Sequence, residues 1–238
     1  MMMKKMTAIL AAALVLLMML GGAALADSTI TVTGKATVQL QPDMARVTLG
    51  VTAVNEEVLK AQQEINIVLG DVVAALTGEE MGIAPEDIAT VNYYIFEKYE
   101  YNYETGASEM VGYEANASLA ILVRDIDQAG AVIDAAMQAG ANQLNGIEFL
   151  SSDQTAARDE ALTLAVQDGA RKAGVIASAA GVQLPKTPDS ITEVTDYSYE
   201  TANTVYTMAR EDSAAGATQL QAGMLNLTAT VTITYEID

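Results

Sequence analysis

The chain has 238 residues and a formal net charge of −19, and it contains no histidine and no cysteine. A field of this sign repels phosphate backbones and anionic lipid surfaces, so nucleic acid and membrane surfaces are not expected as partners. Without histidine and cysteine the chain lacks an imidazole base, a thiolate nucleophile and the usual zinc ligands. Most hydrolase and redox mechanisms are therefore excluded as well.

The first 26 residues have the pattern of a secretory signal peptide. Lys4 and Lys5 precede an apolar run at residues 8–20, and a small-residue stretch ends in Ala24-Leu25-Ala26. An uncleaved anchor is the alternative, but the run is short for a span of about 20 residues. We expect cleavage after Ala26, with no membrane span left and with export to the periplasm, the cell envelope or the extracellular space. Residues 27–238 are predicted to form one domain, and two closely packed halves with a boundary near residue 124 are an alternative.

Residues 30–54 predict two β-strands that turn at Pro42-Asp43 and form an opening hairpin. In the second strand, apolar and polar residues alternate strictly from Ala45 to Ala53, which is typical of a strand with one face on a core. Residues 55–76 then carry apolar residues at spacings of three and four, which predicts an amphipathic helix with Asn55 as its N-cap.

The next segment is rich in tyrosine. Residues 88–99 and 115–123 are predicted to form a hairpin that turns at residues 104–108. The aromatic residues are interpreted either as cross-strand pairs or as a recognition surface, and the two interpretations are compatible if the hairpin tip contacts a second subunit. Six of the ten tyrosines form this candidate interaction surface: Tyr93, Tyr94, Tyr99, Tyr101, Tyr103 and Tyr113.

The rest of the chain alternates helices and strands. Helices are expected at 126–139, after an Asp125 cap, and at 154–180, and strands at 142–150, 190–194 and 225–237. The long helix is rich in alanine and contains Gly169 and Gly174, so we expect another element to pack very close to it. The connection 196–217 shows no period. The predicted fold class is α+β: antiparallel sheets with three main helices packed on one side.

The sequence contains none of the common catalytic, cofactor-binding or metal-binding motifs. The sequence has no phosphate-binding loop, dinucleotide fingerprint, zinc-protease motif or calcium loop. Its acidic pairs are explained by helix capping or by solvated helix faces. We therefore predict no catalytic residue, no cofactor and no metal ligand.

The order and spacing of small motifs along almost the whole mature chain resemble the SIMPL-domain family of exported bacterial envelope proteins, which includes periplasmic or outer-membrane immunogens. The motifs that carry the resemblance are Ile30-Thr31-Val32-Thr33-Gly34, Pro42-Asp43, Leu49-Gly50-Val51, Gly82-Ile83, Gly112-Tyr113, Gly140-Ala141-Asn142, Gly146-Ile147 and Val231-Thr232-Ile233-Thr234-Tyr235. The resemblance implies an α+β fold, a tendency to form homo-oligomers, and an association with envelope stress, including oxidative stress. It supplies no catalytic residues.

Three functions are compatible with these observations. The first is a non-enzymatic, exported scaffold or interaction protein that acts as a homo-oligomer, with a further envelope protein as a partner. The second is a small-molecule or cation binder whose pocket lies among residues 93–113 and 196–217. The third is a weak enzyme that uses carboxylates alone.

Overall fold

The computed structural model describes residues 28–104, 106–194, 199–201 and 218–237. The predicted signal peptide and most of the 196–217 connection lie outside these residues. The chain divides into two compact units. The larger unit contains residues 35–165 and 194–230. The smaller unit contains the residues up to 34, residues 166–193 and the residues from 231 onward. Two antiparallel sheets and three α-helices confirm the predicted α+β class. None of the helices described is both long and apolar enough to span a membrane.

The larger unit is built on a four-stranded antiparallel sheet in the order β3-β4-β2-β5. Its strands are β2 (Met44–Asn55), β3 (Ile88–Asn102), β4 (Ala107–Val123) and β5 (Gln143–Leu150). Helices α2 (Val58–Thr77) and α3 (Ala129–Gln138) pack against β2, and α2 also packs against β4. Two short 3-10 turns, η1 (Pro85–Asp87) and η2 (Ile126–Gln128), precede β3 and α3.

The core of this unit lies between the sheet and the two helices. The alternation predicted for β2 is confirmed, because Ala45, Val47, Leu49 and Val51 are all buried. They pack with the inward faces of β4 and the helices in two clusters. Full burial of such side chains stabilises a fold by about 1.5–3 kcal/mol each. This packing fixes the position of the sheet that contains the exposed residues of β3.

The second sheet contains β1 (Ser28–Leu40), β8 (Leu225–Ile237) and β6 (Ser190–Val194) in that order, and β7 (Tyr199–Thr201) also pairs with β8. One face of β8 is rich in threonine, and the hydroxyls of two of these residues bond to threonines of β1: Thr31 with Thr234 at 3.2 Å and Thr37 with Thr228 at 2.8 Å. The opposite face of β8 is buried from Leu225 to Tyr235. Helix α4 (Thr155–Ala180) agrees with the predicted helix at 154–180.

Two local predictions were wrong. The strands on either side of Pro42-Asp43 do not form a hairpin, because β1 pairs with β8 whereas β2 pairs with β4 and β5. Alternation shows which face of a strand is buried, but it does not identify the neighbouring strand. Asn55 is not the N-cap of α2 either. Glu57 is the N-cap, and the Asn55 carboxamide oxygen instead accepts a hydrogen bond from the Glu57 N–H at 3.1 Å.

The prediction of close packing at the α4 glycines holds at one of two positions. A Cβ atom at Gly169 would lie 2.7 Å from Ile233 Cδ1 and 3.4 Å from Gly34 Cα. At Gly174 it would meet nothing within 4 Å. Therefore only at Gly169 do neighbouring strands pack closely against α4.

Candidate functional site

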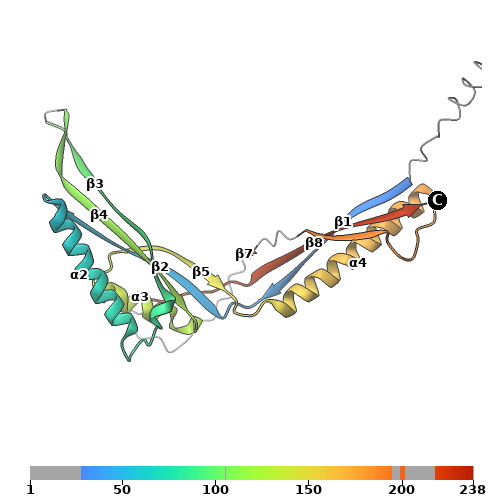
Figure 1. Cartoon of the computed structure of the whole chain (residues 1–238), viewed down its shortest axis with the longest axis horizontal. Coiled ribbons are helices and arrows are strands. Elements are labelled where there is room, and N and C mark those ends of the chain that lie inside the picture. Colours follow the sequence, from blue (N-terminus) through green and yellow to red (C-terminus); the bar gives the residue numbers. More distant parts are fainter. Residues whose placement is uncertain (1–27, 105, 195–198, 202–217, 238) are drawn as a thin grey trace, which may run out of the picture. The chain divides into compact units, whose positions relative to one another are not determined.

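The tyrosine-rich segment forms the predicted hairpin of β3 and β4. The two strands pair from Ile88↔Ile121 to Asn102↔Ala107, and Gly106 takes a positive φ of 71° in the turn. The pairing of β2 with β4 stops at Asn55↔Tyr113. The part of the hairpin beyond that point is therefore two-stranded among the described residues, and Figure 1 shows it at the outer end of the sheet. Isolated two-stranded hairpins are marginal in water, so a further contact would stabilise it.

A glycine on β4 allows a close contact between two backbone segments at the base of the hairpin. Gly112 has φ +143°, and a Cβ atom there would lie 2.6 Å from the Asn55 carbonyl oxygen. The backbone leading from β2 into α2 thus passes directly against β4. Side chains larger than hydrogen are excluded at this position because the obstacle is backbone.

The six predicted surface tyrosines do not form one cluster. The Tyr93 hydroxyl lies 3.1 Å from Asn66 Oδ1 of α2, which places Tyr93 on the helix-covered face of the sheet. Tyr94 lies on the opposite face, where its ring stacks on Phe96 with centroids 5.8 Å apart. Tyr113 is half-buried on β4, opposite Glu97.

Three tyrosines line the outer part of the hairpin. Tyr99, Tyr101 and Tyr103 are exposed, Tyr103 by 91% of its surface. The rings of Tyr101 and Tyr103 meet edge to face at 5.1 Å. The aromatic residues therefore contact each other along one strand, and the expected cross-strand tyrosine pairs do not occur: Tyr99 and Tyr101 lie opposite Met110 and Ser108.

One ion pair and one hydrogen bond involve the carboxylates in the middle of the hairpin. Lys98 Nζ lies 3.0 Å from Glu114 Oε2, and this hydrogen bond lowers the pKa of Glu114. The Tyr99 hydroxyl donates to Glu97 Oε2 at 2.6 Å, which raises the pKa of Tyr99 because ionisation would place two negative charges together. Both shifts move the pKa of the affected group, Glu114 or Tyr99, further from neutral pH.

Strand β3 is an edge of the sheet, and no described strand pairs with its outer side. We call residues 88–96 the β3 edge. This segment contains no charged residue, although the whole chain carries −19. Its exposed apolar side chains are Val91, Tyr93, Tyr94 and Phe96. Proteins usually protect such edges with charges, proline or bulges, and this edge has an irregularity between Thr90 and Asn92 but neither a charge nor a proline. An edge without charges is a template for pairing with another strand.

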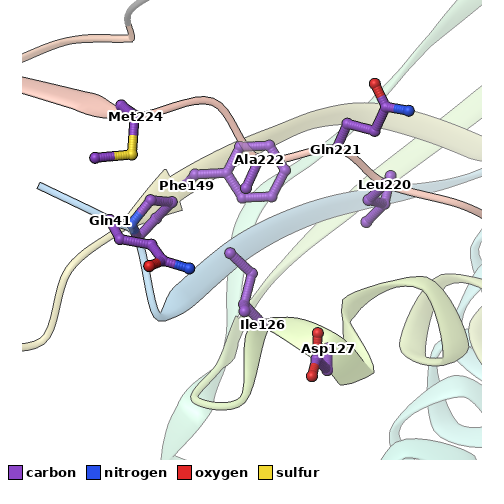
Figure 2. Close-up of a pocket in the computed structure, with 9 residues that line it drawn as sticks. Gln41, Ile126, Asp127, Phe149, Leu220, Gln221, Ala222 and Met224 are labelled. Atoms are coloured by element: carbon purple, nitrogen blue, oxygen red, sulfur yellow. The ribbon is translucent and has the colours of Figure 1, made fainter. Parts of the chain in front are cut away.

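A pocket of about 420 Å³ lies elsewhere in the larger unit, and none of the six tyrosines lines it. It lies beside the Pro42 turn, η2 and the end of β5 (Figure 2). No local sequence pattern indicates this pocket, because its walls come from four separate segments of the chain. No group of three or more acidic side chains within the described residues is arranged to hold a metal ion.

Fold and surface thus define an α+β protein with an uncharged aromatic segment on a sheet edge. Comparison with known proteins gives the family. The chain belongs to the SIMPL family, described as "Protein of unknown function (DUF541)", which matches residues 30–235.

Curated relatives agree with this assignment. An "Uncharacterized protein YggE" of Edwardsiella ictaluri is 26% identical over 190 residues, which cover 80% of this chain and 78% of the relative. The protein of the same name in Escherichia coli K12 is 26% identical over 63% of this chain and 59% of its own length. A "26 kDa periplasmic immunogenic protein" of Brucella melitensis is 28% identical over 65% of this chain and 62% of its own length.

Proposed function

We propose that this SIMPL protein is an exported, non-enzymatic scaffold that acts as a homo-oligomer, and that its copies associate along the β3 edge. The observation that carries the proposal is an uncharged, aromatic segment of the edge strand, residues 88–96, on a strongly acidic chain. Export is supported by the signal-peptide pattern and by the periplasmic name of the Brucella relative. An association with envelope or oxidative stress would then be a consequence of the assembly.

A second copy is the partner that this edge favours. Two chains of net charge −19 repel each other, and the repulsion is smallest where neither surface carries charge. The β3 edge is such a surface. Strand pairing there would satisfy the outward-facing backbone groups of β3 and would bury Val91, Tyr94 and Phe96 at the same time.

The test is the absolute mass of the exported protein by light scattering behind a sizing column, compared with two single variants. Phe96→Lys places a charge on the β3 edge. Ile67→Lys places the same charge at an exposed apolar residue of α2, and it serves as the matched control. We expect an oligomer for the wild type and the control, and a monomer for Phe96→Lys, because a buried unpaired charge opposes association. A Phe96→Lys variant with the wild-type mass would exclude the β3 edge as the interface.

A further inference from the structure

The pocket near Pro42 has mainly apolar walls. Of its nine lining residues six are apolar, namely Pro42, Ile126, Phe149, Leu220, Ala222 and Met224, and the polar ones are Gln41, Asp127 and Gln221. Figure 2 shows Ile126 and Asp127 on one turn of the chain and Phe149, Ala222 and Leu220 on the segments facing it. A small number of polar groups around an apolar space is the usual composition of a small-molecule site.

The walls are held by the rest of the fold. Ile126, Phe149 and Leu220 each pack against the buried core cluster of the larger unit. The Ile126 N–H donates to the Asp43 carbonyl oxygen at 3.1 Å, and Phe149 pairs with the fully buried Ala45. The segment that carries Leu220 is tied to α3, because the Thr218 N–H donates to Asp134 Oδ2 at 3.0 Å. A pocket with fixed walls binds without a large ordering cost.

The charge of the site selects the ligand. Asp127 is the one ionisable residue among the nine that line the pocket, and it is exposed at the rim. A carboxylate has two oxygens and can accept several hydrogen bonds at once. The field of the whole chain has the same sign. Anionic ligands are therefore disfavoured, and a cationic group at the rim is favoured.

The lining residues determine which uncharged part of a ligand the pocket favours. The Phe149 ring offers an apolar face and also attracts cations, and Met224 is a polarisable side chain that adapts to irregular shapes. The volume of about 420 Å³ equals the liquid volume of roughly 14 water molecules. This space fits a body of one ring with a short chain.

We propose that this pocket binds a small amphiphilic cation, with an apolar or aromatic body between Phe149 and Ile126 and a single ammonium group facing Asp127. This site is separate from the β3 edge and does not depend on oligomerisation.

Three probes with the same ring and chain test the site: 4-phenylbutylammonium, 4-phenylbutan-1-ol and 4-phenylbutanoate. Calorimetric titration of the exported protein should give the tightest binding for the ammonium, weaker binding for the alcohol and none for the carboxylate. Equal affinities for the ammonium and the carboxylate would overturn the proposal, as would the absence of binding by all three.

Two variants locate the site. Asp127→Asn should weaken binding of the ammonium about threefold to fivefold, which is typical of an exposed charge pair, and should leave the alcohol unaffected. Asp71→Asn removes the same charge from an exposed position of α2, outside the pocket, and should change neither affinity. If Asp71→Asn weakened ammonium binding as much as Asp127→Asn did, the ammonium would not be placed at Asp127.

A third variant, Ala222→Phe, fills the space and should abolish binding of both the ammonium and the alcohol. Its thermal unfolding is measured alongside to show that it folds. If it did not fold, the Met224 methyl signal in the wild type, labelled with ¹³C at methionine methyl groups, would serve instead. This signal should move on addition of the ammonium while that of Met110 in β4 stays in place. A folded Ala222→Phe variant with wild-type affinity, or an unmoved Met224 signal, would overturn the proposal.

Discussion

At the scale of single residues, Asp43 joins segments that are far apart in the sequence. Its carboxylate accepts hydrogen bonds from the Ser152 hydroxyl and, at 2.8 Å, from the Ser152 N–H. Its own N–H donates to the Leu150 carbonyl, and its carbonyl accepts from the Ile126 N–H. The Pro42-Asp43 pair marks a turn in the sequence, but nothing near it identifies Ser152 as a partner. The wrong hairpin prediction and the undetected pocket have the same cause, since both depend on contacts between segments that are far apart in the sequence.

The Asp43 carboxylate makes stability depend on pH. The Ser152 hydroxyl is the largest cause of the lowered pKa of Asp43, relative to an ordinary value of 3.8. Because the folded-state pKa lies below the unfolded one, this contribution is complete above pH 3.8 and is lost as pH falls through the folded-state value. Asp43→Asn should lower the free energy of unfolding at pH 7, and the difference from the wild type should shrink below pH 3.8. Urea unfolding of the wild type and of Asp43→Asn at several pH values measures this difference. A difference that stayed constant with pH would contradict the assignment of this pH dependence to the Asp43 carboxylate.

Gly112 gives a second prediction at this scale. Gly112→Ala should destabilise the protein by about 1–3 kcal/mol, because the new Cβ would meet backbone atoms and the positive φ is unfavourable for alanine. Gly82→Ala is the matched control, with φ +61° and no atom within 4 Å of the new Cβ, so it adds the conformational cost without the contact. Equal losses in the two variants, measured by urea unfolding, would show that the contact with Asn55 is unimportant.

At the scale of elements, the sequence predicted strands and helices well wherever one face is buried. Strands β2 and β8 carry long alternating patterns and are present, as are α4 and the β3–β4 hairpin, which were predicted from caps and composition. Sheet membership was not predictable, because a period-two pattern is compatible with any neighbouring strand. The candidate interaction surface was likewise predictable only as far as local sequence allows. The tyrosine surface was identified from composition within one hairpin, whereas the distribution of its side chains over both faces follows from register.

Helix α4 offers a paired test of close packing. Gly174→Ala should raise the free energy of unfolding by about 0.5–1 kcal/mol, the usual gain for an open helical position. Gly169→Ala should gain less or lose stability, because Ile233 must move. Thermal or chemical unfolding of the two variants decides this, and equal gains would show that β8 does not constrain the helix.

At the scale of the whole molecule, the large net negative charge opposes self-association. Each copy carries −19, so association along an uncharged edge must overcome repulsion between the remaining surfaces. The Debye length falls from about 30 Å at 0.01 M salt to about 8 Å at 0.15 M. We therefore expect tighter self-association at the higher salt concentration, measured by sedimentation. Weaker association at higher salt would indicate an interface held by ion pairs instead.

Hydrogen–deuterium exchange of the β3 edge at two protein concentrations tests the central claim most directly. At low concentration the outward-facing amides of residues 88–96 should exchange quickly, since no described strand pairs with them. At high concentration they should become protected, while a peptide from α2 keeps the same exchange rate at both concentrations. A protein whose mass rises with concentration while residues 88–96 remain unprotected would contradict the β3 edge as the site of assembly.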